Sequence, residues 1–188
     1  EIDIPGRWAR QPIGIKFLGK RRIVAEFYRP DILATFYYAE KSLMPGSPDI
    51  AYIWQTFSST KSPRDFGREL LPSELRRFRM IMEEYTDVNE FALLSARLRW
   101  LSSRLALQIA GWHAETNEEV NCVIVPQRRG DGWIMEEIGF RFPRDWHARL
   151  PAPNSGGGYM SLIEQMWNSL SWNTTLPPLY VPSKIRVS

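Results

Sequence analysis

Hydrophobic and polar residues alternate along the first part of the chain. Ile13, Ile15 and Phe17 are separated by single polar or small residues, which is the two-residue period of a β-strand. A second strand is predicted over residues 21–27, which also mix apolar and polar side chains. Residues 30–43 leave two alternatives open, because an aspartate near their start would cap a helix whereas their β-branched and aromatic content favours a strand.

From residue 72 onward the apolar residues recur at the spacing of a helix instead. Ser73 is a suitable N-cap for one helix, and Asp87 with Glu90 has the spacing of a capping box for another. Over residues 88–112 the apolar residues recur at steps of three and four, and they cover nearly every side of the predicted helix. We therefore predict a helical hairpin whose second helix, 88–112, is buried at the centre of the domain.

The C-terminal half returns to strand patterns before it ends in a short helix. Residues 121–125 form an apolar run that is typical of a buried strand, and Ile138, Phe140 and Phe142 alternate with other residues after a glycine-containing connection. Such a connection between two strands predicts a β-hairpin. Residues 159–170 have the amphipathic pattern of a short helix.

These elements together predict an α+β fold, in which an antiparallel sheet packs against the buried helix at 88–112. We divide the chain into an irregular arm at 1–12, a single α+β domain at 13–172 and a Pro-rich C-terminal tail at 173–188. The length of 188 residues fits one domain of ordinary size. The chain starts with Glu1 rather than Met, which we interpret as the sign of a domain cut from a larger protein or of a processed product.

Composition and charge narrow the class of protein only moderately. Hydrophobic residues make up 44% and charged residues 24%, which is ordinary for a globular domain, and the net charge of +3 permits contact with nucleic acid or an acidic membrane surface without requiring it. Cys122 is the single cysteine, so we predict no intrachain disulfide and an intracellular, reducing location in the cytoplasm or nucleus. No apolar run reaches 18 residues, and no transmembrane segment is predicted.

The chain has few of the residues that carry catalytic or metal chemistry. Its two histidines and one cysteine lack the paired spacing of zinc ligands, so we predict no metal and no cofactor. Cys122 lies in an apolar strand, where a small buried side chain is expected rather than a nucleophile. Glu136 and Glu137 would point to opposite faces of a strand, and we interpret both as solvated. Enzymatic activity is therefore left uncertain and is not favoured.

A run of three glycines precedes the short C-terminal helix. Gly156, Gly157 and Gly158 could present backbone N–H groups to an anion at the start of that helix. A flexible connector is the alternative interpretation, because the lysine of a phosphate-binding loop does not follow.

Basic residues gather in several segments and have aromatic residues among them. The candidates for binding a partner or nucleic acid are Lys20, Arg21, Arg22, Arg76, Arg77, Arg128, Arg129 and Trp133. Arginine with exposed aromatic residues is typical both of single-stranded nucleic-acid surfaces and of protein interfaces. Acidic neighbours could neutralise most of these segments, whereas residues 20–22 lack such neighbours.

The Pro-rich tail contains the stretch PPLY, with Pro177, Pro178 and Tyr180. It resembles the PPxY pattern of WW-domain ligands, whose prolines favour an extended helix that docks on aromatic grooves. The alternative is a strap that packs its own apolar residues onto the domain.

The function predicted from these patterns is that of a non-enzymatic protein-interaction or scaffold domain of a larger protein, which binds through an Arg- and aromatic-rich surface. One alternative is a nucleic-acid-binding or viral matrix-like structural protein that uses the basic segments, with RNA or single-stranded nucleic acid as partner. A second alternative is an enzyme with an unrecognised site near Gly156–Gly158. The oligomeric state is left open.

Overall fold

The structure is a computed structural model of the 188-residue chain. The residues that it describes are 2–4, 8–18, 21–31, 33–43, 70–71, 73, 91–101, 104–114, 116–129, 132–144, 158–170 and 185–187. Most of these residues lie in β-strands, and one complete helix lies among them.

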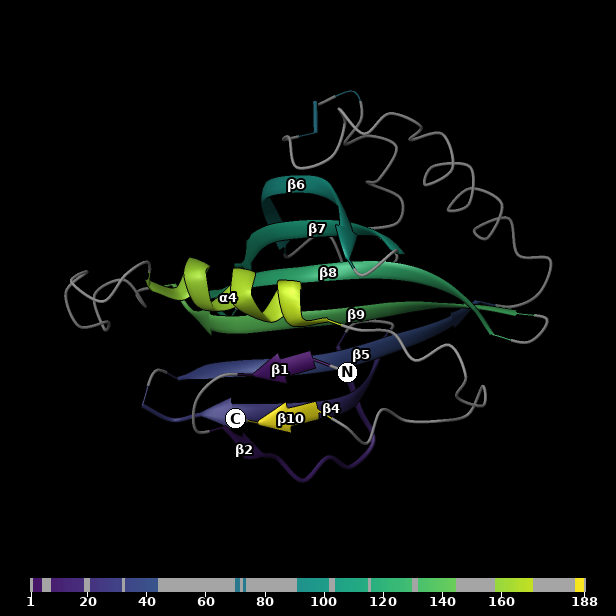
Figure 1. Cartoon of the computed structure of the whole chain (residues 1–188). Coiled ribbons are helices and arrows are strands. Elements are labelled where there is room, and N and C mark those ends of the chain that lie inside the picture. The colour runs from purple at the N-terminus through teal and green to yellow at the C-terminus, as the bar shows by residue number, and fades with distance from the viewer. Residues whose placement is uncertain are drawn as a thin grey trace.

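One antiparallel sheet forms the body of the described chain (Figure 1). Its strands are β2 (Ala9–Arg10), β3 (Lys16–Leu18), β4 (Arg21–Arg29), β5 (Ala34–Leu43), β6 (Phe91–Leu101), β7 (Arg104–His113), β8 (Glu118–Arg129) and β9 (Gly132–Pro143). They follow the order β2-β4-β5-β9-β8-β7-β6, and β3 also pairs with β4. Several strands that follow one another along the chain pair as hairpins, namely β4 with β5, β6 with β7, β7 with β8 and β8 with β9, whereas β5 and β9 meet from distant parts of the chain.

One face of this sheet is covered by the helix and by the two ends of the chain. The helix α4 (Gly158–Ser169) lies across it, as do β1 (Ile2–Ile4) and β10 (Ile185–Val187), which pair in parallel (Figure 1). We call this side of the sheet the α4 face and the other side the opposite face. Because Ile2 is paired with Ile185, the chain's two ends are joined by backbone hydrogen bonds.

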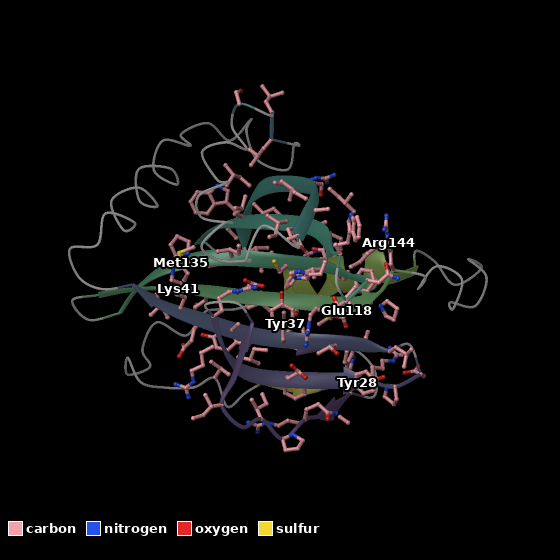
Figure 2. All side chains as sticks on the ribbon, turned by 180° about the vertical axis from the view of Figure 1, so that it is seen from behind. Tyr28, Tyr37, Lys41, Glu118, Met135 and Arg144 are labelled. Atoms are coloured by element: carbon pink, nitrogen blue, oxygen red, sulfur yellow. The ribbon has the colours of Figure 1, made fainter. Side chains whose placement is uncertain are left out.

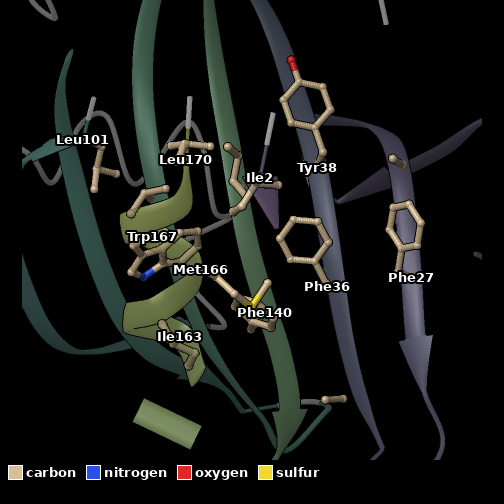
Figure 3. Close-up of a cluster of buried hydrophobic side chains, with 14 of the residues drawn as sticks. Ile2, Phe27, Phe36, Tyr38, Leu101, Phe140, Ile163, Met166, Trp167 and Leu170 are labelled. Atoms are coloured by element: carbon tan, nitrogen blue, oxygen red, sulfur yellow. The ribbon is translucent and has the colours of Figure 1, made fainter. Parts of the chain in front are cut away.

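The main core lies between α4 and the sheet (Figure 3). Ile163, Met166, Trp167 and Leu170 are buried and recur at the spacing of one helical face. Trp167 packs edge-on against Phe140 of β9, with ring centroids 5.7 Å apart. Each such side chain contributes about 1.5–3 kcal/mol by leaving water, so this contact fixes α4 on the sheet.

The opposite face is buried over its central strands as well. Ile23, Tyr37 and Ala39 form a second apolar cluster, to which Ile13 adds a partly buried side chain. Gly139 of β9 is required at this place, because a Cβ there would lie 2.5 Å from the Tyr37 hydroxyl oxygen.

The structure corrects the fold class predicted from the sequence, because residues 91–101 and 104–113 form two strands and not one buried helix. β6 ends at Leu101 and β7 begins at its partner Arg104, so only two residues separate the paired strands. β7 lies between two neighbours and is covered on both faces, so its residues 106–109 are all buried. Such a strand is apolar at consecutive positions, and its pattern resembles that of a helix that is apolar on all sides.

The described part of the chain is therefore mainly β-sheet with one short complete helix, and the predicted α+β fold with a central helix and helical hairpin is wrong. Of the other helix predicted after residue 72, nearly all residues lie outside the described part of the chain. The ambiguous stretch 30–43 contains strand β5, and the predicted strand at 21–27 is confirmed as β4.

The C-terminal predictions agree with the structure. β8 and β9 form the expected hairpin, with Arg129 paired to Gly132, and Ile138, Phe140 and Phe142 are buried on the α4 face. The expected short helix is α4. In the segment predicted as an irregular arm, residues 2–4 and 9–10 form strands β1 and β2.

Candidate functional site

A group of ionised and polar side chains is buried on the opposite face, at the centre of the sheet. Arg21 of β4 and Tyr37 of β5 both donate hydrogen bonds to the carboxylate of Glu137 on β9, the tyrosine over 2.5 Å. Arg21 is 1% exposed and Glu137 is 0% exposed. We call these three residues, with Cys122 of β8 beside them, the buried charge cluster.

The electrostatics of the buried charge cluster oppose reactivity. Burial raises the pKa of the Cys122 thiol and of the Tyr37 phenol well above their ordinary values, and the charge of Glu137 adds to both shifts. Burial alone would lower the pKa of Arg21, but Glu137 outweighs it and holds the guanidinium charged. A reactive cysteine needs a lowered pKa and access to substrate, so this cluster serves as an internal ion pair of the sheet.

A second set of charges extends the buried charge cluster toward the ends of β7 and β8. Arg141 donates to Glu26 over 3.2 Å, lies 3.9 Å from a Glu118 oxygen, and places its guanidinium 5.6 Å from the centre of the Tyr37 ring. Figure 2 shows Tyr37 and Glu118 on the side of the sheet away from α4. Arg141 therefore offsets part of the negative charge of Glu26 and Glu118 on this part of the face.

His113 lies at the border of this charged region. It is paired with Glu118 across β7 and β8, and its ring meets the edge of Phe91 at a centroid distance of 5.1 Å. Burial lowers the pKa of His113 below its ordinary value of 6.5, and the positive charges of Arg21 and Arg141 lower it further. The imidazole is therefore held neutral at neutral pH.

Glu136 and Glu137 do point to opposite faces, but both are buried, so the prediction of solvated side chains is wrong. The Tyr38 hydroxyl donates to Glu136 over 2.7 Å on the α4 face, while Glu137 belongs to the buried charge cluster. Each carboxylate is placed beside a tyrosine of β5 because that strand is the neighbour of β9.

A second group of large side chains, which is exposed and not buried, lies along β6 at the outer edge of the described sheet. Leu94 is 63% exposed and Trp100 is 55% exposed. Arg97, which lies between them in sequence, is exposed too. It pairs with Gln108 and so points to the α4 face, whereas Trp100, three positions further along the strand, points to the opposite face. Leu71 is 58% exposed and is kept near this strand, because the preceding residue, Leu70, donates its N–H to the Ala96 carbonyl over 2.9 Å. We call Leu71, Leu94, Arg97 and Trp100 the β6 surface.

The local backbone explains how Leu94 comes to be exposed. Leu93 is paired with Gly111 and Ser95 with Ala110, so Leu94 is an extra residue opposite β7. An extra residue of this kind is a β-bulge, which bends an edge strand and redirects a side chain. Arg99 points to the same face as Arg97, but it is held against the protein there by Gln108 and by Glu164 at 2.7 Å.

The structure places the basic candidates differently from one another. Arg21 is buried in its ion pair, whereas Arg22 is exposed on β4. Arg128 and Arg129 end β8, and Trp133 pairs with Arg128 across the hairpin to β9. The candidates that lie outside the described residues are Lys20, Arg76, Arg77, Gly156, Gly157, Pro177, Pro178 and Tyr180. Gly158 is the first residue of α4.

Sequence reasoning missed the β6 surface because it assigned those residues to a buried helix. The stretch Ala96-Arg97-Leu98-Arg99 alternates apolar and charged residues with the period of a strand, and this signal was available. Ser102 and Ser103, which separate two apolar runs, were a second signal for a break in the predicted helix.

The described residues show neither a metal-binding group of side chains nor a membrane-spanning helix. In that part of the chain, no three His, Cys, Asp or Glu side chains are placed to hold a metal ion. None of its helices has the length and apolar character needed to cross a membrane. No protein-family model matches the sequence, and no curated protein is significantly similar to it, so the function is argued from the chemistry of the site.

Proposed function

We propose that the protein is a non-enzymatic protein-interaction domain that binds its partner through the β6 surface. The observation that carries the proposal is the exposure of Trp100 and Leu94, on either side of Arg97 in sequence, on one edge strand. Tryptophan and arginine are the residues that most often dominate the binding energy of protein interfaces. Large apolar side chains gathered on one edge are also a mark of interaction sites.

Energetics favour a protein partner for this surface over nucleic acid. Covering a Leu or Trp side chain contributes about 1.5–3 kcal/mol or more, and three such side chains belong to the β6 surface. Nucleic-acid affinity depends instead on several cations that neutralise phosphates, and Arg97 is the single cation of this surface. RNA binding is therefore an alternative outcome of the test below.

The test compares the wild-type chain with variants of the β6 surface as bait in extracts of the source cells. Trp100→Ala and Leu94→Asp remove the contact, while Leu33→Asn is the matched control, because Leu33 is an exposed leucine in the turn between β4 and β5. We expect one set of proteins to be retained by wild type and by the control, and to be lost from both β6 variants. A purified partner should then bind Trp100→Ala at least about tenfold more weakly in calorimetry.

Two results would contradict this function. One is a set of bound proteins that the β6 variants retain unchanged. The other is tight binding of labelled single-stranded RNA that weakens steeply with salt and requires Arg97, which would indicate a phosphate-driven surface.

A further inference from the structure

The edge of the sheet that is farthest from β6 is formed by a short stretch of chain that pairs with β4 in two places, as β2 and as β3. β2 pairs with the C-terminal half of β4, where Arg10 faces Phe27, and β3 pairs with its N-terminal end, where Lys16 faces Ile23. Between them the Gln11 N–H donates to the Glu26 carbonyl over 2.9 Å. Figure 1 shows β2 at the edge of the sheet far from β6. Residues 12–15 therefore form a bend that is fixed to the sheet at both ends.

The bend separates two isoleucines that a regular strand would place on the same side. Ile13 packs against the apolar cluster of Ile23, Tyr37 and Ala39, and so anchors the bend. Ile15 is 90% exposed, the highest value among the large hydrophobic residues of the described chain. A Cβ placed on the intervening Gly14 would meet no atom within 4 Å, so the bend projects into open space.

Two exposed cations flank this bend on β2 and β4. Arg10 and Arg22 make no ion pair with any described residue of the protein. Arg10 is paired with Phe27, and Arg22 with Glu40, two residues on the α4 side of the sheet. Paired residues point to the same face, so both cations lie on that side, with Glu40 as the one acidic group opposite Arg22.

We propose that Arg10, Ile15 and Arg22, the Ile15 tip, bind the surface of an anionic lipid bilayer. Ile15 enters the boundary between headgroups and acyl chains, and the two guanidinium groups bind lipid phosphates beside it. An apolar side chain between cations is the combination that such a surface selects, because the bilayer supplies an apolar layer directly beneath a layer of negative charge.

A bilayer suits this geometry better than an acidic protein does. Ile15 is almost fully exposed on the bend, and an aliphatic side chain can enter a fluid layer without a preformed pocket. Protein anchors are instead enriched in aromatic residues that fill a shaped pocket. The Ile15 tip and the β6 surface occupy opposite edges of the sheet, so this proposal stands or falls independently of the protein-interaction function.

The test is sedimentation of the full chain with vesicles of phosphatidylcholine that contain 30% phosphatidylserine, with pure phosphatidylcholine vesicles as reference. We expect binding to the anionic vesicles only, and a decrease as salt screens the arginines. Ile15→Asn should lower the partition coefficient about tenfold, and Arg10→Gln and Arg22→Gln about fivefold each. Leu33→Asn, at the far end of β4, is the matched control and should bind like wild type.

Three outcomes would overturn the proposal. They are an absence of binding to the anionic vesicles, equal binding by Ile15→Asn and wild type, and equal loss in the Leu33→Asn control. If soluble polyglutamate binds as well as the vesicles and Ile15→Asn leaves both unchanged, the site is a cationic surface for acidic polypeptides. Melting curves of each variant keep a loss of folding apart from a loss of lipid binding.

Discussion

The buried charge cluster and the β6 surface use similar residues for opposite purposes. Arg21 is buried on the opposite face with Glu137 and Tyr37, whereas Arg97 is exposed on the edge strand β6, on the other face of that strand from Trp100. In the first region every charge is compensated, and burial makes any change there costly. In the second region the side chains are exposed, so a partner can cover them, and we expect substitutions there to cost the fold less.

The role of an arginine in this protein is set by the place of its strand in the sheet. β4 is held between β5 on one side and β2 with β3 on the other, so Arg21 is enclosed. β6 has a described partner strand on one side only, which leaves room for exposed side chains. Substitutions in the buried charge cluster should therefore lower stability more than substitutions in the β6 surface. Substitutions in the β6 surface should instead lower partner binding more.

The largest expected effect is that of Glu137→Ala. This change leaves the Arg21 guanidinium and the Tyr37 hydroxyl buried without their shared acceptor. Breaking a buried ion pair on one side costs about 3–5 kcal/mol in the free energy of unfolding. Urea unfolding should show this loss, whereas Arg97→Ala should change the same free energy by less than about 0.5 kcal/mol.

A double variant sharpens the interpretation of that result. Replacing both partners, as Arg21→Met with Glu137→Leu, removes the uncompensated charge and should recover part of the lost stability. If Glu137→Ala is no more destabilising than Arg97→Ala, the carboxylate is not enclosed by the sheet, and the contrast between the two regions disappears.

The next effect in size concerns the backbone beneath the buried charge cluster. Gly139→Ala adds a methyl group 2.5 Å from the Tyr37 hydroxyl oxygen and 2.7 Å from Cys122 Cβ. Neither neighbour is a flexible chain end, so we expect a loss of about 1–3 kcal/mol from overpacking. The midpoint of thermal unfolding measures it, and Gly14→Ala, where a Cβ meets nothing within 4 Å, is the matched control. Equal midpoints for the two variants would contradict the close packing at Gly139.

The two regions also show what could be predicted from the sequence. The hairpin of β8 and β9 was predictable, because alternation and a glycine-containing connection are both local signals. The ion pair of Arg21 and Glu137 was not, because these residues are 116 positions apart and meet only through the pairing of β4, β5 and β9. That pairing also buried Glu136 and Glu137, whose charges had suggested solvent exposure.

The β6 surface was not predicted from the sequence for a different reason. Strand β7 is buried on both faces, so its apolar residues lack the alternation that identifies a strand with one solvated side. Once that segment was interpreted as one helix, Trp100 and Leu94 were assigned to its apolar sides. Periodicity alone could not decide between the two structures, and Arg97 and Arg99 were too few to outweigh it.

The free energy of unfolding should depend on pH through His113, which lies at the border of the charged region. The pKa of His113 in the folded protein is below its ordinary value of 6.5, so the unfolded chain takes up the proton first as the pH falls. The free energy of unfolding is therefore unaffected by His113 above pH 6.5, and it declines as the pH falls from there through the folded pKa. Urea titrations from pH 8 to pH 5 measure the decline. His113→Gln should flatten it, and an equal slope in this variant would contradict the assignment.

The smallest expected effect on stability lies in the β6 surface and completes the comparison. Trp100 and Trp167 are the same residue type, but one is 55% exposed on an edge strand and the other is packed between α4 and Phe140. Trp100→Ala should lower the free energy of unfolding by about 1 kcal/mol, because more than half of its surface remains in water in the folded protein. Trp167→Ala should cost about 3–5 kcal/mol through the cavity that it leaves in the core. Urea unfolding of both variants, with partner binding measured on Trp100→Ala, decides the issue: a Trp100 variant as unstable as the Trp167 variant would make that side chain part of the core and not a binding residue.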